Sequence, residues 1–246
     1  EPVIFQIKAN FGGYDLIFID EAQELPNAGK SLKILVDHLP DTYIIATGSS
    51  SFELSNKLGD PLTGRKRQIQ LFPLALLELD NEYGWAEVHS QIDNHLIFGT
   101  YPEVLTTPIK DDKIEYLEGL IEGYLFKDLL KFEKLKNANK LKDLLRLIAL
   151  QVGHEVSHQA LGIQLGMSKN TVERYLDLLE KVFVIVRVRG FSRNLRKEVT
   201  KSSKYYFFDN GLRNALIQDS KPLNLRNDNG QLWENFLFIE RLKKRH

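Results

Sequence analysis

The chain has 246 residues, with 33 basic and 33 acidic side chains, and so a formal net charge of zero. It has no cysteine, which excludes disulfides, thiolate zinc sites and cysteine nucleophiles. No apolar run approaches the roughly 18 residues that a membrane span needs, and no secretory signal pattern opens the sequence. These features predict a cytoplasmic globular protein without a membrane partner.

The charges are unevenly distributed along the chain. Residues 1–100 carry 7 Lys/Arg and 14 Asp/Glu, whereas residues 101–246 carry 26 and 19. An acidic front and a basic back indicate different partners for the two halves. Chance segregation between domains would give the same pattern, so charge alone does not decide between these explanations.

Residues 1–78 have the pattern of a strand, a helix and a second strand. Short apolar runs at Leu16–Ile19 and Tyr43–Ala46 predict buried parallel strands. Between them, Ala28–Leu39 carries leucines at helical spacing. The order predicts a βαβ unit with a right-handed crossover.

Polar residues follow each of these two strands. Asp20 and Glu21 come after the first strand, and Thr47, Gly48 and Ser49 come after the second. Parallel sheets bind ligands at this edge, where an Asp can hold Mg²⁺ and a Glu can polarise a water for attack on a terminal phosphate. Two solvated acids and an ordinary Gly/Ser turn are the structural alternative.

Gly29-Lys30-Ser31 has the form of the last part of a phosphate-binding loop, G-x-x-x-x-G-K-[ST]. The first glycine position is occupied by Glu24, whose carboxylate would repel phosphate. Pro26 and Asn27 precede the segment in place of a strand, so we expect Asn27 to cap a helix and Lys30 to be solvated. No other stretch matches the loop, and N-terminal truncation of a longer protein explains its absence; a degenerate ATPase is the alternative.

Arg65 follows a glycine in a loop, where it could project toward a phosphate on a neighbouring subunit. It also belongs to a basic run, Arg65-Lys66-Arg67, and an ordinary surface arginine is the alternative. Residues 79–135 are predicted to be helical. Within them, the stretch FGTYPEVL contains Gly and Pro and predicts a turn between two helices.

Residues 136–204 have a helix-turn-helix pattern followed by a hairpin. Ser157–Leu165 predicts the first helix and Lys169–Lys181 the second, with Ser168 as its N-cap. The runs VFVIVRV and SKYYFF predict a β-hairpin, the wing of a winged-helix module. Such modules commonly dock the second helix in the major groove of DNA.

Basic residues gather on this predicted module. From Lys181 to Lys204 there are eight basic residues and one acid, a pattern typical of phosphate-binding surfaces. Winged helices also serve as protein-interaction modules, so DNA and protein partners both remain open. The predicted nucleic-acid-binding residues are Lys169, Asn170, Arg174, Arg187, Arg189, Arg193, Arg196 and Lys197.

Residues 154–158 spell HEVSH, which matches a zinc-protease motif. That motif needs both histidines on one continuous helix. Gly153 precedes it and Ser157 marks a helix start, so a turn region is the favoured interpretation. A zinc hydrolase built on His154, Glu155 and His158 is therefore the weakest functional hypothesis.

Residues 205–246 begin in an apolar strand and end on a helical stretch. Asp209 is expected to form a turn with Asn210-Gly211. In restriction-endonuclease-like folds a helix Glu precedes a strand Asp and an E-x-K, and Glu234 matches that helix Glu. The sequence ends before the other two can appear, so we expect no nuclease chemistry from this chain.

Seven motifs occur in order: LIFIDEAQELP, IIATGSSSFEL, LTGR, LFPLALLEL, YPEVL, KYYFFDNGLRNALI and GQLWENFLF. Together they resemble a family of prokaryotic AAA+-type ATPases with a winged-helix region and a C-terminal DUF4143-type domain of nuclease-like fold. The resemblance implies a partial α/β P-loop NTPase-like core, an α-helical lid, a winged helix-turn-helix and the start of the nuclease-like α/β domain. These correspond to residues 1–78, 79–135, 136–204 and 205–246.

By this resemblance, Asp20 and Glu21 are the Walker B acids, with Mg²⁺ on Asp20. Ser49 is the sensor of the γ-phosphate, with Thr47 as the second choice for nucleotide contact. Arg65 is the arginine finger of a homo-oligomer, a role worth roughly 10³–10⁵ in rate. ATP and Mg²⁺ are implied for the parent protein, and neither is expected bound to this chain.

The sequence therefore predicts a fragment of an AAA+-type ATPase with a possible DNA-binding winged helix. The chain itself is expected to hydrolyse ATP poorly or not at all. The alternative is a DNA- or protein-binding module whose ATPase core is vestigial.

Overall fold

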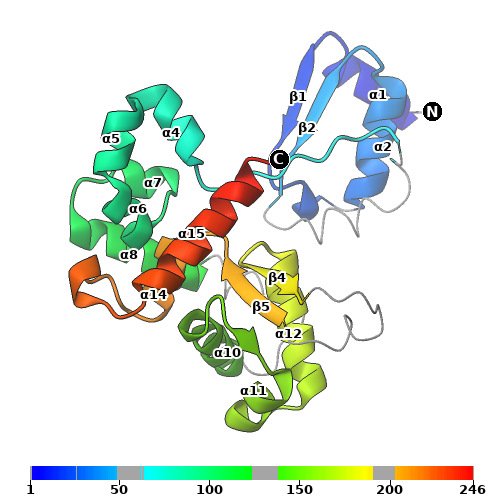
Figure 1. Cartoon of the computed structure of the whole chain (residues 1–246). Helices are drawn as coiled ribbons and strands as arrows, with labels where there is room; N and C mark the ends of the chain where they lie inside the picture. Colours follow the sequence, from blue (N-terminus) through cyan, green and yellow to red (C-terminus); the bar gives the residue numbers. More distant parts are fainter. Residues whose placement is uncertain are drawn as a thin grey trace. The chain divides into compact units, whose positions relative to one another are not determined.

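The computed structural model describes residues 2–25, 27–48, 62, 64–123, 138–190 and 203–245. They form two compact units, Glu1–Ile69 and Gln70–His246, called here the N-terminal and C-terminal units (Figure 1). None of the helices in these ranges is both long and apolar enough to cross a membrane.

The N-terminal unit contains the predicted βαβ arrangement. Its elements are α1 (Pro2–Phe11), β1 (Leu16–Ile19), the 3₁₀ turn η1 (Ala22–Glu24), α2 (Ala28–His38) and β2 (Tyr43–Ala46). The two strands pair in parallel, with Leu16 opposite Tyr43 and Ile19 opposite Ala46. The parallel pairing and the intervening helix are confirmed.

The expectation that both strands are buried is wrong for this unit. Leu16, Phe18, Tyr43 and Ile45 are 51%, 59%, 79% and 48% exposed, and they share one face because alternate residues of a strand point to the same side. Helices α1 and α2 lie on the other side of the strands (Figure 1). A parallel sheet is buried only where both faces are covered, and here helices cover one.

Asn27 does not cap α2 as the sequence suggested. It holds the N-cap position with φ 52°, and its side chain makes no capping hydrogen bond. The left-handed backbone at Asn27 is one that asparagine tolerates better than most residues. Lys30 is exposed, as expected of a solvated helix residue.

The C-terminal unit opens with five helices. These are α4 (Leu76–Tyr83), α5 (Trp85–Ser90), α6 (Ile92–Phe98), α7 (Pro102–Thr106) and α8 (Lys110–Leu120). The predicted turn between α6 and α7 is confirmed, and it depends on Gly99, whose φ is +76°. A Cβ at Gly99 would lie 1.9 Å from the Asp209 carboxylate, so only glycine fits at this position of the turn.

A helical and β-sheet subregion follows: α10 (Ala138–Leu150), β3 (Glu155–Val156), α11 (His158–Leu165), α12 (Lys169–Lys181), β4 (Ile185–Arg189) and β5 (Ser203–Phe207). The strands form an antiparallel sheet in the order β3-β5-β4. Ser157 caps α11 by accepting from the backbone N–H of Ala160, and Ser168 caps α12 by accepting from that of Thr171. Both predicted helices and the antiparallel pairing of the two predicted strands β4 and β5 are confirmed.

One hydrophobic core holds these elements together. Val172, Tyr175, Leu178 and Leu179 of α12 are buried in it, as their helical spacing predicts. Strand β5 lies against α15 and between β3 and β4, and its residue Tyr205 is fully buried. Burial of each such side chain stabilises the folded state by roughly 1.5–3 kcal/mol. Because these residues hold one face of α12 in the core, the opposite face of the helix is exposed.

The end of the chain is built into the same unit. Helix α14 (Asn210–Leu216) contacts α6, α8 and α10, and α15 (Asn229–Lys243) contacts β5 and α6. The predicted domain division at 204/205 falls inside strand β5. Asn210-Gly211 begins α14 where a turn was expected, because the Asp209 carboxylate caps the helix by accepting from the backbone N–H of Leu212.

Candidate functional site

The acid pair and Thr47 meet at one edge of the N-terminal sheet. Asp20 and Glu21 leave the end of β1, and Thr47 leaves the end of β2, in parallel register. The Thr47 hydroxyl donates to Asp20 Oδ1 at 2.5 Å. The backbone N–H of Glu21 donates to the same hydroxyl oxygen at 3.3 Å. Three of the predicted site residues therefore converge, and this acidic edge is defined by Asp20, Glu21 and Thr47.

Main-chain hydrogen bonds fix the same edge. Thr47 N–H donates to the carbonyl of Ile19 at 2.9 Å, and Ala22 N–H donates to the carbonyl of Thr47 at 2.8 Å. Between them Glu21 adopts a left-handed backbone conformation with φ 49° and ψ 45°. That conformation costs a residue other than glycine roughly 1–2 kcal/mol, and each hydrogen bond contributes about 1 kcal/mol. The two hydrogen bonds that Thr47 accepts from Glu21 and Ala22 therefore contribute a free energy comparable to the cost of the left-handed conformation.

The acidic edge offers the oxygen ligands that Mg²⁺ prefers. Protein sites for Mg²⁺ commonly supply one or two carboxylates, and water and substrate phosphates complete the shell. Asp20 and Glu21 are exposed and Thr47 is half-buried, so the edge is open to such a ligand. No cluster of three or more His, Asp or Glu side chains suited to a metal occurs in the described ranges. The edge thus fits Mg²⁺ held jointly with phosphate, and not an all-protein metal cage.

Arg65 is not part of the acidic edge. It pairs with Asp37, in the last turn of α2. Helix α2 starts beyond the carboxyl end of β1 and runs back to the amino end of β2, so its last turn lies at the opposite end of the sheet. The predicted action of Arg65 on a neighbouring subunit stays a prediction. Ser49 lies outside the described residues.

Two backbone N–H groups of the Gly29-Lys30-Ser31 segment donate within the protein. In a phosphate-binding loop, backbone N–H groups at the start of the helix face the ligand. Here the N–H groups of Lys30 and Ser31 both donate to the carbonyl of Asn27, at 2.9 and 3.0 Å. The segment also follows the acidic strand β1, which is the wrong order for such a loop.

The predicted nucleic-acid-binding residues fall in three different settings. Lys169, Asn170 and Arg174 lie exposed on α12, and Lys169 pairs with Glu173 at 3.6 Å. Arg189 is exposed at the end of β4. Arg187 lies inside that strand, opposite Tyr205, and its guanidinium Nε donates to Ser203 Oγ at 2.9 Å. Arg193, Arg196 and Lys197 are outside the described residues.

The HEVSH residues do not form a zinc site. Glu155 lies in β3 and His158 begins α11, so the histidines do not share a helix. His158 Nδ1 lies 3.1 Å from Glu173 Oε1, and Nε2 lies 2.8 Å from the Tyr205 hydroxyl. Both ring nitrogens are therefore engaged within the protein. The hydrogen bond from His158 lowers the pKa of Glu173, and burial raises the pKa of Tyr205 to about 12.

A buried network of asparagine side chains accounts for two of the seven motifs, KYYFFDNGLRNALI and GQLWENFLF, which lie outside the acidic edge. The Asn235 amide pairs with both backbone groups of Phe207, at 2.7 and 3.0 Å, and also donates to Asn210 Oδ1 at 2.7 Å. Asn214 Nδ2 donates to the carbonyl of Ile97 at 2.8 Å. These asparagines join α6, β5, α14 and α15. In the sequence, these asparagines lie within the apolar runs FFDNGLRNAL and LWENF, and this pattern could have indicated that they are buried.

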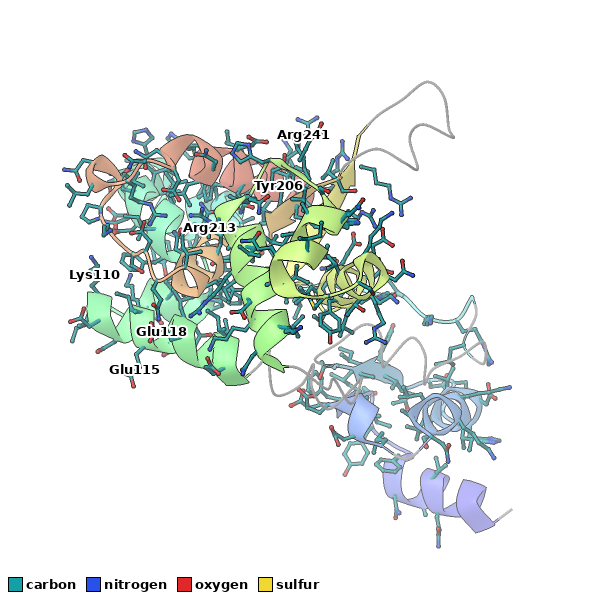
Figure 2. The ribbon with its side chains drawn as sticks, turned by 90° about the horizontal axis from the view of Figure 1, so that it is seen from below. Lys110, Glu115, Glu118, Tyr206, Arg213 and Arg241 are labelled. Carbon is teal, nitrogen blue, oxygen red and sulfur yellow. The ribbon has the colours of Figure 1, made fainter. Side chains whose placement is uncertain are left out.

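A charged group adjoins this network. Arg213 donates to the carbonyl of Ala149 at 2.7 Å and pairs with Asp228, which Arg226 also contacts at 2.9 Å. Figure 2 shows Arg213 among the helices of this unit, whereas Glu115 points away from α8. Burial acts to raise the pKa of Asp228, but hydrogen bonds from Arg226 and Arg213 outweigh it and lower this pKa to about 2.

Two family models match this chain, one in each part. Residues 2–79 match a model described as an AAA domain, which includes the whole acidic edge. Residues 89–224, more than half of the chain, match a model described as a domain of unknown function, DUF8612. The chain belongs to the DUF8612 family. A DUF4143-type domain is not shown by these matches and stays a prediction.

The relatives are longer proteins described as uncharacterized. One from Haemophilus influenzae is 24% identical, and the match covers 96% of this chain and 66% of the relative. Rv2008c of Mycobacterium tuberculosis is 28% identical, covering 90% and 49%. MJ1544 of Methanocaldococcus jannaschii is 25% identical, covering 91% and 52%. The chain thus spans about half to two thirds of their length, and no solved structure matches it significantly.

Proposed function

We propose that the acidic edge is the catalytic half of a Mg²⁺–ATP hydrolysis site in a longer AAA-type ATPase. The observation that supports this most is the joining of Asp20 and Glu21 through the Thr47 hydroxyl, within the residues that match an AAA domain. A strand end with two acids and a polar partner from the neighbouring strand is what such a site requires.

Each residue of the edge has a separate role in this proposal. Asp20 holds Mg²⁺, which supplies charge neutralisation of the phosphates when it is bound. Glu21 orients and polarises the attacking water by accepting a hydrogen bond from it. Ser49 is proposed as the contact to the terminal phosphate, with Thr47 as the second choice for that contact.

The chain is further proposed to hydrolyse ATP poorly or not at all by itself. Its sequence contains no complete G-x-x-x-x-G-K-[ST] motif, and the N–H groups of Lys30 and Ser31 donate to the carbonyl of Asn27. Backbone N–H groups of such a loop make most of the phosphate contacts, so affinity for ATP is expected to be weak.

An ATPase assay with Mg²⁺ tests this proposal on the purified chain. The expected rate is close to that of the Glu21→Gln variant. Robust hydrolysis that Glu21→Gln abolishes would contradict the proposed inactivity while supporting the role of the acidic edge. Robust hydrolysis unaffected by Glu21→Gln would contradict that role.

A second proposal concerns α10, β3, α11, α12, β4 and β5, whose order and sheet arrangement fit a winged helix. We propose that the exposed face of α12 binds the phosphates of duplex DNA through Lys169 and Arg174. The exposure of both side chains favours it. A titration with duplex DNA at low salt tests it, and the absence of binding would leave a protein partner as the interpretation.

A further inference from the structure

We propose that Thr47 is the positioning residue of the acidic edge, because its hydroxyl holds Glu21 in the left-handed backbone conformation that directs the Glu21 carboxylate. Naming Glu21 as the group that acts on water rests on the proposed function. The hydrogen bonds by which Thr47 holds Glu21, called here the Thr47 clamp, do not depend on the proposed function.

The backbone of Glu21 needs an external constraint. Its φ of 49° lies in the region that glycine, and less often asparagine or aspartate, occupies. Glutamate has no short side chain that could stabilise this turn locally. A left-handed residue also redirects the chain and its side chain together, so the conformation decides where the carboxylate leaves the end of β1.

Thr47 supplies contacts on both sides of Glu21. Its hydroxyl accepts from the N–H of Glu21, and its carbonyl accepts from the N–H of Ala22. Ala22 is fully buried, which fixes the chain just after the turn. Glu21 is therefore held through its own N–H and through that of the next residue, and both of these bonds lead to Thr47. The Glu21 carbonyl also accepts from the N–H of Glu24 at 2.9 Å, which starts η1 but does not involve the neighbouring strand.

The hydroxyl of Thr47 both donates and accepts at this edge. A threonine hydroxyl has one proton, which goes to Asp20 Oδ1, and its lone pairs accept from Glu21. The two acids are thus coupled through a single oxygen atom. Valine has the same shape without that oxygen, whereas serine keeps it. These two substitutions separate the hydroxyl from the volume of the side chain.

NMR spectra of the whole chain test the clamp at Glu21 directly. In Thr47→Val, the Glu21 amide is expected to exchange about tenfold faster and its backbone chemical shifts to leave the left-handed range. The Ala22 amide is expected to keep its protection, because its acceptor is the main-chain carbonyl. Thr47→Ser should restore the wild-type signals of Glu21.

Thr42 offers a matched control in the same sheet. Its hydroxyl donates to the carbonyl of Tyr14 at 2.9 Å, before the start of β2. Thr42→Val removes a comparable hydrogen bond and is expected to leave Glu21 unchanged. Unchanged Glu21 signals in Thr47→Val, or an equal change in Thr42→Val, would overturn the proposal.

A second variant covers the case in which Thr47→Val does not fold. Glycine adopts the left-handed conformation without steric cost, so adding Glu21→Gly to Thr47→Val should restore folding. A double variant that stays unfolded would also overturn the clamp. The proposed function is judged separately, by Mn²⁺ binding to the wild-type chain and to Asp20→Asn. If the wild-type chain did not bind Mn²⁺, the proposed function would fail, and the NMR test of Thr47 would still be valid.

Discussion

The Asp209 carboxylate accepts a hydrogen bond from the backbone N–H of Thr100 at 2.8 Å, and so joins two segments 109 residues apart. The other carboxylate oxygen accepts from the N–H of Leu212 at 3.1 Å and caps α14. Asp209 is buried, and the N–H of Thr100 is buried with it. One side chain thus connects the turn after α6 to the start of α14.

Asp209→Ala is expected to lower the free energy of unfolding by about 2–4 kcal/mol. Loss of the cap costs about 1 kcal/mol, and leaving the Thr100 N–H buried without a partner adds about 1–3 kcal/mol. Urea unfolding followed by circular dichroism measures the change. Asp93→Ala removes an exposed acid of α6 in the same unit and should cost less than about 0.5 kcal/mol. Equal losses for the two variants would contradict this role of Asp209.

Acid should weaken the C-terminal unit through Asp228. Its pKa is about 2 in the folded protein against 3.8 normally, so its contribution to stability is complete above about pH 4 and disappears as the pH falls toward 2. We expect the difference in unfolding free energy between wild type and Asp228→Asn to shrink over this pH interval. A difference that stays constant from pH 6 to pH 2 would show that the Arg213 and Arg226 contacts do not act through the Asp228 charge.

His158 and Tyr205 should show measurable energetic coupling. A double-mutant cycle with His158→Ala and Tyr205→Phe is expected to give a coupling free energy of about 1 kcal/mol, because a partly buried hydrogen bond of 2.8 Å joins the two side chains. Tyr206→Phe is the matched control, since the Tyr206 hydroxyl donates to Glu234 at 2.7 Å and not to His158. Coupling of the same size in the control cycle would mean that the effect is not the His158–Tyr205 bond.

The proposed DNA surface predicts a change in salt dependence. If Lys169 and Arg174 each contact a phosphate, the double variant Lys169→Ala/Arg174→Ala should reduce the slope of log K against log salt by about 2. Fluorescence anisotropy with a labelled duplex measures it. Lys110→Ala/Lys221→Ala removes two exposed basic residues from other parts of the same unit and should leave the slope unchanged. Equal effects of both double variants would indicate non-specific attraction.

Local signals in the sequence were sufficient for several elements. The helix α12 was predictable because Ser168 is a strong capping residue and the apolar residues after it recur at helical spacing. Strands β1 and β2 were predictable as compact apolar runs, and the convergence of Asp20 and Thr47 follows from their parallel order. These predictions depend on residues close together in the chain or on a simple topological rule.

Contacts between distant residues were not accessible in the same way. Arg65 pairs with Asp37, 28 residues away, and no local pattern announces that partner. Asp209 resembles a turn residue until Thr100 and Leu212 are seen to donate to it. Exposure of the β1–β2 face likewise depends on what covers the sheet, which periodicity alone does not specify.

Mn²⁺ binding tests the central claim about the acidic edge most directly, because Mn²⁺ replaces Mg²⁺ at oxygen-ligand sites and is detected by electron paramagnetic resonance. We expect the wild-type chain to bind Mn²⁺ weakly, with a dissociation constant of about 1 mM or somewhat below. Asp20→Asn should remove this binding, whereas Asp41→Asn, an exposed acid before β2, should keep it. Binding of Mn²⁺ that Asp20→Asn leaves unchanged would contradict the assignment of Asp20 as the metal ligand.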